Sequence, residues 1–158
     1  MTTPGRRTES RSPFGASAWN AAPSMADSPN VAVVRRAFDA FTLRDVERLV
    51  ATCSPDVEFD LPTARLARTG QPYRGHEGVR TYMRDAARVW AELRLEAREF
   101  HEAGDLVVAV GRVYAWGEGR VVDTPSAWVW KLRDGLVLRV TVYESRSEAF
   151  LAAGLATD

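Results

Sequence analysis

Apolar residues recur at spacings of three and four in the first third of the chain, which is the period of an amphipathic helix. The first such stripe consists of Val31, Val34, Phe38 and Phe41. Ser28 and Pro29 precede it, and these residue types favour the N-cap and first turn of a helix. A second, shorter stripe follows Asp45 and comprises Val46, Leu49, Val50 and Cys53. Because Ser54-Pro55 ends it, we predict a helical hairpin over residues 29–53.

The pattern changes to strict alternation at residues 57–61, where apolar and acidic residues alternate before Pro62, so we predict a strand there. A third helical stripe starts at Gly78 and consists of Val79, Tyr82, Met83, Ala86 and Trp90. Glycine-containing turn sequences then separate four further predicted strands, at residues 93–100, 106–116, 121–132 and 136–144. Ser147 is the predicted N-cap of a last helical turn, which Gly154 ends.

Helices that come first and strands that follow are typical of an α+β fold. We expect a curved antiparallel sheet with three helices packed on its concave side. A chain of 158 residues, of which 46% are hydrophobic, is long enough for one domain with one core. We assign this domain to residues 29–158.

The first 28 residues show no apolar periodicity and are rich in Ser, Pro, Gly, Ala and Thr, so we expect a disordered tail. The tail lacks the continuous apolar stretch of a secretory signal. Met25 lies just before the first predicted helix and is an alternative translation start. In that case residues 1–24 are not translated.

The charge balance and the cysteine content indicate which kinds of binding partner and which compartment to expect. Basic and acidic residues number 21 each, so no net positive field favours nucleic acid or an anionic membrane surface. No apolar run approaches the length of about 18 residues that a membrane span needs. The single cysteine, Cys53, lies on an apolar stripe, which predicts a core position and is compatible with a reducing cytosol. We therefore expect a soluble cytoplasmic protein that binds neither nucleic acid nor membrane.

Four sequence segments carry a family resemblance when they are taken together. They are SPDVEF at 54–59, YRGHEGV at 73–79, WVWKLRDG at 128–135 and EAFLAAGL at 148–155. In order and spacing they resemble the SnoaL-like branch of the nuclear transport factor 2-like superfamily, over about residues 30–155. The resemblance implies a cone-shaped α+β roll of the cystatin-like kind, with a pocket inside. Members include polyketide cyclases, ketosteroid isomerases, epoxide hydrolases and dehydratases, so the resemblance alone assigns no chemistry.

Strand alternation predicts which side chains face that pocket, because residues two apart share a face. The predicted wall is aromatic and aliphatic and consists of Phe38, Phe41, Phe59, Leu61, Tyr82, Val110, Tyr114, Trp116, Trp128, Trp130 and Val142. Such a wall suits a flat or hydrophobic organic molecule that few polar contacts orient. The alternative is that these side chains fill the cone as core.

An enzyme of this fold needs a general base within the apolar wall, where burial raises the pKa of a carboxylate toward neutrality. Asp60 and Glu144 are the candidate bases, and Arg112 and Tyr114 are candidates for stabilising negative charge. Alternatively, Arg112 and Glu144 form a structural ion pair between neighbouring strands.

Several departures from the relatives argue against a steroid-isomerase reaction. The resemblance places Leu61 where ketosteroid isomerases carry their catalytic aspartate, and Asp60, one residue away, would then point to solvent. Ala37 stands in the position of their tyrosine. Trp128 stands in the position of their protonated acid, and of a histidine in related SnoaL-like sequences.

Metal and cofactor sites are not predicted. His76 and His101 are expected to be exposed, and neither lies in a pair with metal-ligand spacing. Gly117-Glu118-Gly119 follows a strand but opens no helix, so we interpret it as a hairpin turn and not a phosphate loop.

The sequence leaves three hypotheses for the function. The first is a pocket protein that binds a small hydrophobic metabolite. The second is a cofactor-independent cyclase, isomerase or hydrolase that uses a pocket carboxylate. The third is an interaction protein whose cone is plugged by Trp116, Trp128 and Trp130. Under all three the resemblance implies a homodimer through the open sheet face, with Val113, Thr141 and Tyr143 as contacts.

Overall fold

A computed structural model of the protein describes residues 27–63 and 71–156. The helices in these stretches are α2 (Pro29–Thr42), α3 (Val46–Ala51), α5 (Gly75–Val89) and α6 (Arg146–Ala153). The strands are β1 (Cys53–Asp60), β2 (Tyr73–Arg74), β3 (Glu92–Ala103), β4 (Leu106–Gly117), β5 (Arg120–Arg133) and β6 (Leu136–Tyr143). The predicted tail and the alternative start at Met25 lie outside the described residues.

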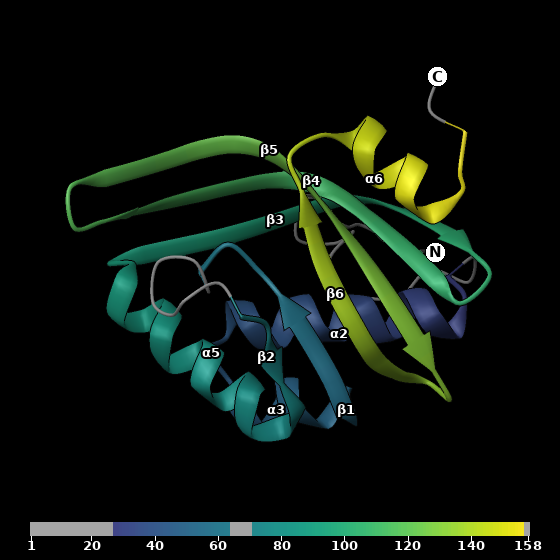
Figure 1. The fold of residues 1–158 in the computed structure, drawn as a ribbon, viewed down its shortest axis with the longest axis horizontal. Helices are drawn as coiled ribbons and strands as arrows, with labels where there is room; N and C mark the ends of the chain where they lie inside the picture. The colour runs from purple at the N-terminus through teal and green to yellow at the C-terminus, as the bar shows by residue number, and fades with distance from the viewer. Residues whose placement is uncertain (1–26, 64–70, 157–158) are drawn as a thin grey trace, which may run out of the picture.

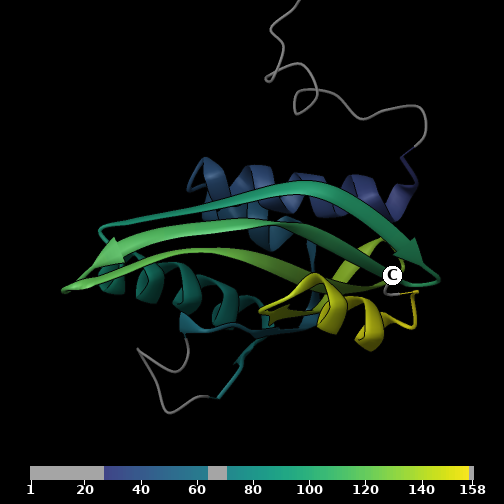
Figure 2. The same ribbon diagram turned by 90° about the horizontal axis from the view of Figure 1, so that it is seen from above.

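One curved sheet contains all six strands, in the order β2-β1-β6-β5-β4-β3. Neighbouring strands are antiparallel except β1 and β6. The sheet arches over α2, α3 and α5, whereas α6 lies on the opposite side (Figure 1). We call the face toward α2, α3 and α5 the inner face and the other the outer face. Seen from above, α2 runs beside β3, the last strand of the sheet (Figure 2).

The predicted α+β fold with helices on the concave side is therefore confirmed, with α6 as a fourth helix on the outer face. The predicted loop before the third helix contains a further short strand, β2, which pairs with β1. None of the helices in the described stretches is long and apolar enough to cross a membrane.

Tight turns fix the register of the long strands. Glu118 and Gly119 both have positive φ, 51° and 77°, and so do Asp134 and Gly135, at 55° and 77°. Two successive residues with positive φ are typical of the type I′ turn, whose twist matches that of the strands. The first turn pairs Gly117 with Arg120 and thereby sets the register of β4 and β5 over their whole length.

Side-chain caps begin three of the helices. The Ser28 hydroxyl accepts a hydrogen bond from the Val31 amide at 3.1 Å, and the Asp45 carboxylate accepts one from the Arg48 amide at 3.2 Å, as predicted. The predicted cap of α6 was wrong by two residues. Ser145 and not Ser147 is the N-cap, because its extended backbone lets its hydroxyl accept from the Glu148 amide at 3.1 Å.

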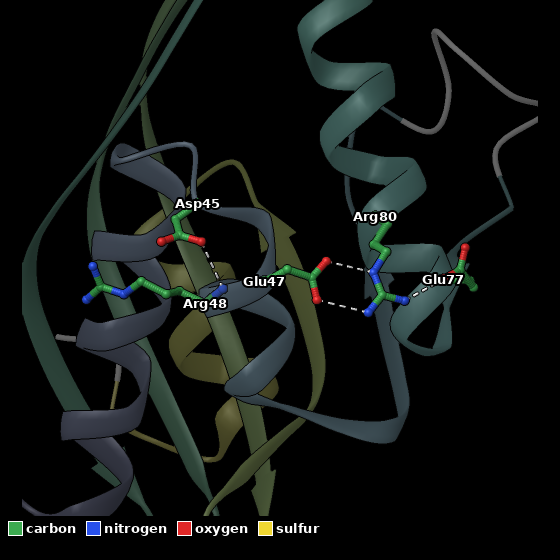
Figure 3. A network of polar contacts seen from close by, with 5 residues as sticks. All are labelled: Asp45, Glu47, Arg48, Glu77 and Arg80. Atoms are coloured by element: carbon green, nitrogen blue, oxygen red, sulfur yellow. Dashed lines mark hydrogen bonds and ion pairs between the residues drawn. The ribbon is translucent and has the colours of Figure 1, made fainter.

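The helical hairpin is joined to α5 by an exposed ionic network (Figure 3). Arg80 donates two hydrogen bonds to the Glu47 carboxylate, at 2.9 and 3.0 Å, and one to Glu77 at 2.5 Å. The hydrogen bonds from Arg80 lower the pKa of the Glu47 carboxyl below its usual value. Because solvent screens such pairs, we interpret the network as one that orients α3 against α5 and adds little stability.

Cys53 lies in the core, as predicted, but on β1 and not on the preceding helix. Helix α3 ends at Ala51, and the Cys53 thiol donates to the Leu49 carbonyl at 3.3 Å. Burial raises the pKa of this thiol to about 11. It is therefore protonated near neutral pH and is not a nucleophile.

Candidate functional site

A cavity of about 260 Å³ lies between the inner face of the sheet and the helices. Helices α2, α3 and α5 contribute Ala37, Phe38, Phe41, Leu49 and Tyr82 to its wall. The sheet contributes Phe59, Leu93, Leu95, Val113, Ala115, Val122, Ser126, Trp128, Trp130, Val140 and Val142, and Leu61 and Trp90 lie just beyond strand and helix ends. The exposed residues of the lining, Pro62, Thr124, Pro125 and Glu144, mark its mouth.

Aromatic side chains form two groups at the base of this cavity, which we together call the aromatic layer. The Phe38 ring meets the rings of Trp128 and Trp130 edge to face, each at a centroid distance of 5.2 Å. Tyr82 stacks on Phe41 at 6.0 Å and meets Phe59 edge to face at 5.7 Å. Burial raises the pKa of the Tyr82 hydroxyl above its usual value, so this group is neutral near pH 7. The layer couples α2 to the sheet through contacts that fix the ring orientations.

Eight of the eleven side chains predicted for the wall line this cavity. They are Phe38, Phe41, Phe59, Leu61, Tyr82, Trp128, Trp130 and Val142. The structure places the other three on the outer face. Val110 packs in the cluster that holds α6, the guanidinium of Arg94 lies 4.7 Å from the Tyr114 ring centroid, and Trp116 is 45% exposed.

The outer-face position of these three residues follows from the register of β4 and β5. Trp128 pairs with Ala109, and Trp130 pairs with Val107. Cross-strand partners share a face, so the small residues of β4 lie inward beside the two tryptophans. Both alternating sets of β4 are largely apolar, although the larger one includes Arg112, and the sequence prediction assigned the larger set inward. Trp128 and Trp130 of β5 already occupy much of the space at the inner face, so the smaller side chains of β4 fit there and the larger ones do not.

Sequence reasoning therefore missed Val113 and Ala115, which line the cavity from β4. Leu93 and Leu95 of β3 and Val122 of β5 were also missed. The signal that could have found them is the two-residue turn at Glu118-Gly119, because its geometry fixes every pair between β4 and β5. Val113 was also a predicted dimer contact, and its place on the inner face excludes it from the outer surface.

The three candidate catalytic residues do not come together. Asp60 follows Phe59 on β1 and so has the opposite orientation, away from the cavity, which it does not line. Arg112 lies on the outer face, where its Nε donates to Asp123 Oδ1 at 2.9 Å. The predicted alternative of an Arg112–Glu144 ion pair is therefore wrong, because β5 separates β4 from β6 and supplies Asp123. Glu144 lies at the mouth of the cavity and is exposed.

Few polar groups line the cavity. Ser126 is 5% exposed, and its hydroxyl makes no hydrogen bond with any described residue. Glu144 likewise has no hydrogen-bond or ion-pair partner among the described residues. The Trp130 indole N–H is buried without a hydrogen-bond partner in the same part of the chain, and it lies in the aromatic layer. The site can therefore orient a ligand through Ser126 and Glu144.

Metal-ligating residues do not cluster in residues 27–63 and 71–156, where no group of three or more His, Cys, Asp or Glu could hold an ion. The histidines lie outside the cavity lining and are half-buried, where exposed positions were predicted. His76 Nε2 lies 2.9 Å from the Cys53 carbonyl oxygen, and His101 Nε2 lies 2.9 Å from Glu99 Oε1. Both side chains have structural partners.

The chain matches one family model, that of the SnoaL-like domain, over residues 34–140. No curated protein matches the sequence. The matched region includes most of α2, all of α3 and α5, the sheet up to the middle of β6, and all the aromatic residues of the cavity base.

Solved structures with the same fold give a consistent comparison. An NTF2-like protein of unknown function from Burkholderia pseudomallei is 26% identical, with a TM-score of 0.68 over 80% of this chain and 98% of that one. TerC, co-crystallized with polyporic acid, is 28% identical, with a TM-score of 0.66 over 80% and 98%. RV0760c from Mycobacterium tuberculosis, in complex with estradiol-17beta-hemisuccinate, is 15% identical, with a TM-score of 0.63 over 76% and 96%.

Proposed function

Because this chain belongs to the SnoaL-like domain family of the nuclear transport factor 2-like superfamily, we propose that its cavity binds one small, largely apolar organic molecule. The observation that carries the proposal is the cavity of about 260 Å³ itself. Protein interiors pack without voids of this size, so a sheet and helices that needed only a core would fill it. Its volume lies just below the usual range of about 300–1,000 Å³ for ligand pockets, which favours a small ligand.

The relatives support a role in small-molecule binding. TerC was co-crystallized with polyporic acid, and the Mycobacterium tuberculosis protein is in complex with estradiol-17beta-hemisuccinate. Both proteins have the fold of this chain. Because the fold is shared, ligand binding is the simplest explanation for the cavity of this chain, which aromatic side chains line.

Binding accounts for the site better than catalysis does. Asp60 and Arg112 do not line the cavity, and Glu144 is the one carboxylate of the described residues that lines it. An exposed position at the mouth does not provide the desolvation that tunes a general base. A plugged cone is also disfavoured, because Trp128 and Trp130 line an open cavity and Trp116 lies on the outer face.

The test is binding of 1-naphthylmethanol, a neutral flat probe, measured by quenching of tryptophan fluorescence. We expect saturable binding to the wild-type chain. The variant Val113→Trp fills the cavity and should weaken binding by about tenfold or more, since overpacking a filled site costs about 1–3 kcal/mol. Val121→Trp makes a similar change at a position that is 74% exposed on the hairpin and should bind as wild type does.

Absence of saturable binding to the wild-type chain would contradict the proposal. Equal affinity of the probe for the Val113→Trp and Val121→Trp variants would show that it binds outside the cavity. Native mass spectrometry of freshly purified protein, repeated after denaturation, complements this test. A discrete bound mass that disappears on denaturation would identify a retained ligand.

We also propose that the protein works as a homodimer in the cytosol. Thr141 is half-buried on the outer face beside the α6 cluster, which includes its cross-strand partner Val129. Trp116 and Val121 are a cross-strand pair with exposed apolar surface. Surfaces of this kind favour association. The protonated thiol of the single cysteine, Cys53, is compatible with a reducing compartment.

A further inference from the structure

The described lining of the cavity is asymmetric in charge. One residue of that lining, Glu144, has a carboxylate side chain, and no arginine, lysine or histidine of the described residues lines the cavity. The other polar lining groups are neutral hydroxyls, such as those of Ser126 and Thr124. A ligand therefore meets an apolar wall with one negative charge at its mouth.

Glu144 and Ser126 are placed to act together. Ala127 of β5 and Tyr143 of β6 are the last pair of their ladder. Ser126 and Glu144 are the next residues beyond this pair, one on each strand, so they have the same orientation toward the cavity. The Ser126 hydroxyl and the Glu144 carboxylate both lack partners among the described residues. A hydrogen-bond donor at the mouth can reach both.

No cationic side chain of the described residues competes with a ligand for this cavity. The guanidinium of Arg44 lies 4.6 Å from the Phe41 ring centroid, but it donates to the backbone oxygens of Phe41 and Leu93. Arg44 lines the neighbouring clefts and not this cavity.

We propose that the ligand class is a hydrophobic amine, which is protonated near pH 7. Its apolar body occupies the cone, and its ammonium group lies at the mouth, where it donates hydrogen bonds to the Glu144 carboxylate and the Ser126 hydroxyl. This position keeps the charge partly hydrated, which avoids the penalty of burying an ion in an apolar cavity. The inference rests on the proposed function, since it names the chemistry of the ligand in the same cavity.

The test compares three probes with one naphthalene body: 1-naphthylmethylamine, 1-naphthylmethanol and 1-naphthoic acid. We measure their dissociation constants at pH 7 and low salt by isothermal titration calorimetry. We expect the amine to bind about fivefold or more tighter than the alcohol, and the acid to bind weakest. Added salt should weaken binding of the amine and leave that of the alcohol unchanged.

Two variants test which carboxylate causes the preference for the amine over the alcohol. Glu144→Gln should reduce the affinity of the amine to that of the alcohol without changing the affinity of the alcohol. Glu148→Gln removes a carboxylate from α6, on the outer face, and should change neither. Thermal melting of both variants checks that they fold, and the salt dependence of the wild-type chain tests the same point without a variant.

The outcomes separate the two proposals. If the alcohol binds in the cavity but the amine gains nothing, or if the acid binds tightest, the amine inference is overturned and the pocket remains. An amine preference that survives Glu144→Gln would overturn the role of this carboxylate. If none of the three probes binds, both proposals fall.

Discussion

Gly111 determines how closely two strands approach each other. The pairing of β3 with β4 shifts register between Ala97 and Glu99, and Gly111 lies opposite this bulge. A Cβ atom on Gly111 would lie 1.7 Å from the backbone oxygen of Glu96. We expect Gly111→Ala to lower the free energy of unfolding by about 3 kcal/mol, because backbone atoms of β3 must move to admit the methyl group. Urea denaturation measures the change.

Gly104→Ala is the matched control for this substitution. Gly104 has open space around its Cβ position but a positive φ of 61°, so alanine there meets backbone strain without a clash. Its expected cost is about 1 kcal/mol. Equal losses in the two variants would show that strand approach is not the reason for glycine at position 111.

Individual elements follow from the sequence where one signal dominates. Ser28 and Asp45 begin α2 and α3 as predicted, since a side-chain cap is a local interaction. The inward face of β4 did not follow, because apolar residues occupy both of its faces and alternation gives no preference. Only pairing with Trp128 and Trp130 decides between them, and that pairing is a property of two strands and their turn.

The candidate site shows the same limit. The aromatic residues of α2, β5 and the end of β1 were found from periodicity. The positions of Asp60 and Arg112 were not found in this way. The presence of a charged residue on a strand does not by itself tell which face of the sheet its side chain occupies, because that depends on the register. Asp123, the partner of Arg112, lies on the neighbouring strand, and its proximity depends on a register that the sequence prediction did not use.

Helix α6 is attached to the outer face by packing and by one charged cluster. Glu99 on β3 accepts hydrogen bonds from His101 and from Arg146 of α6, and these bonds lower the pKa of its carboxyl. A lowered pKa means that the ionised form stabilises the fold above the usual pKa of a glutamate, and that this stability is lost as the pH falls through the lowered value. Attachment of α6 should therefore weaken under acidic conditions.

Glu99→Gln tests this attachment. The variant should be less stable than wild type at pH 7 by about 0.5–1 kcal/mol, since the pair is largely exposed, and the difference should shrink as the pH falls below about 4. Urea denaturation at pH 7 and in acid measures it. Glu96→Gln removes a carboxylate whose one ion-pair partner among residues 27–63 and 71–156 is Arg98 of the same strand, and it should have less effect. A difference that persists unchanged in acid would argue against the ionic contribution.

The whole molecule uses the two faces of one sheet for different purposes. The inner face, with the helices, encloses the cavity, whereas α6 covers only part of the outer face. Of the mouth residues, Thr124 and Pro125 lie on β5 and Glu144 follows β6, all beyond the last β5–β6 pair, and Pro62 follows β1. Assembly through the outer face would therefore leave the mouth of the cone accessible, so that ligand binding and association are compatible.

Sedimentation velocity tests the proposed assembly. We expect the wild-type chain to sediment with twice its mass of 17.5 kDa. Thr141 pairs with Val129 on the outer face, and Thr141→Arg should shift the equilibrium to the monomer because it places a charge in an interface core. Leu151→Arg, at a position of α6 that is 75% exposed, should leave the dimer intact. A dimer that only Leu151→Arg disrupts would place the interface on α6, and a wild-type monomer at all concentrations would contradict association.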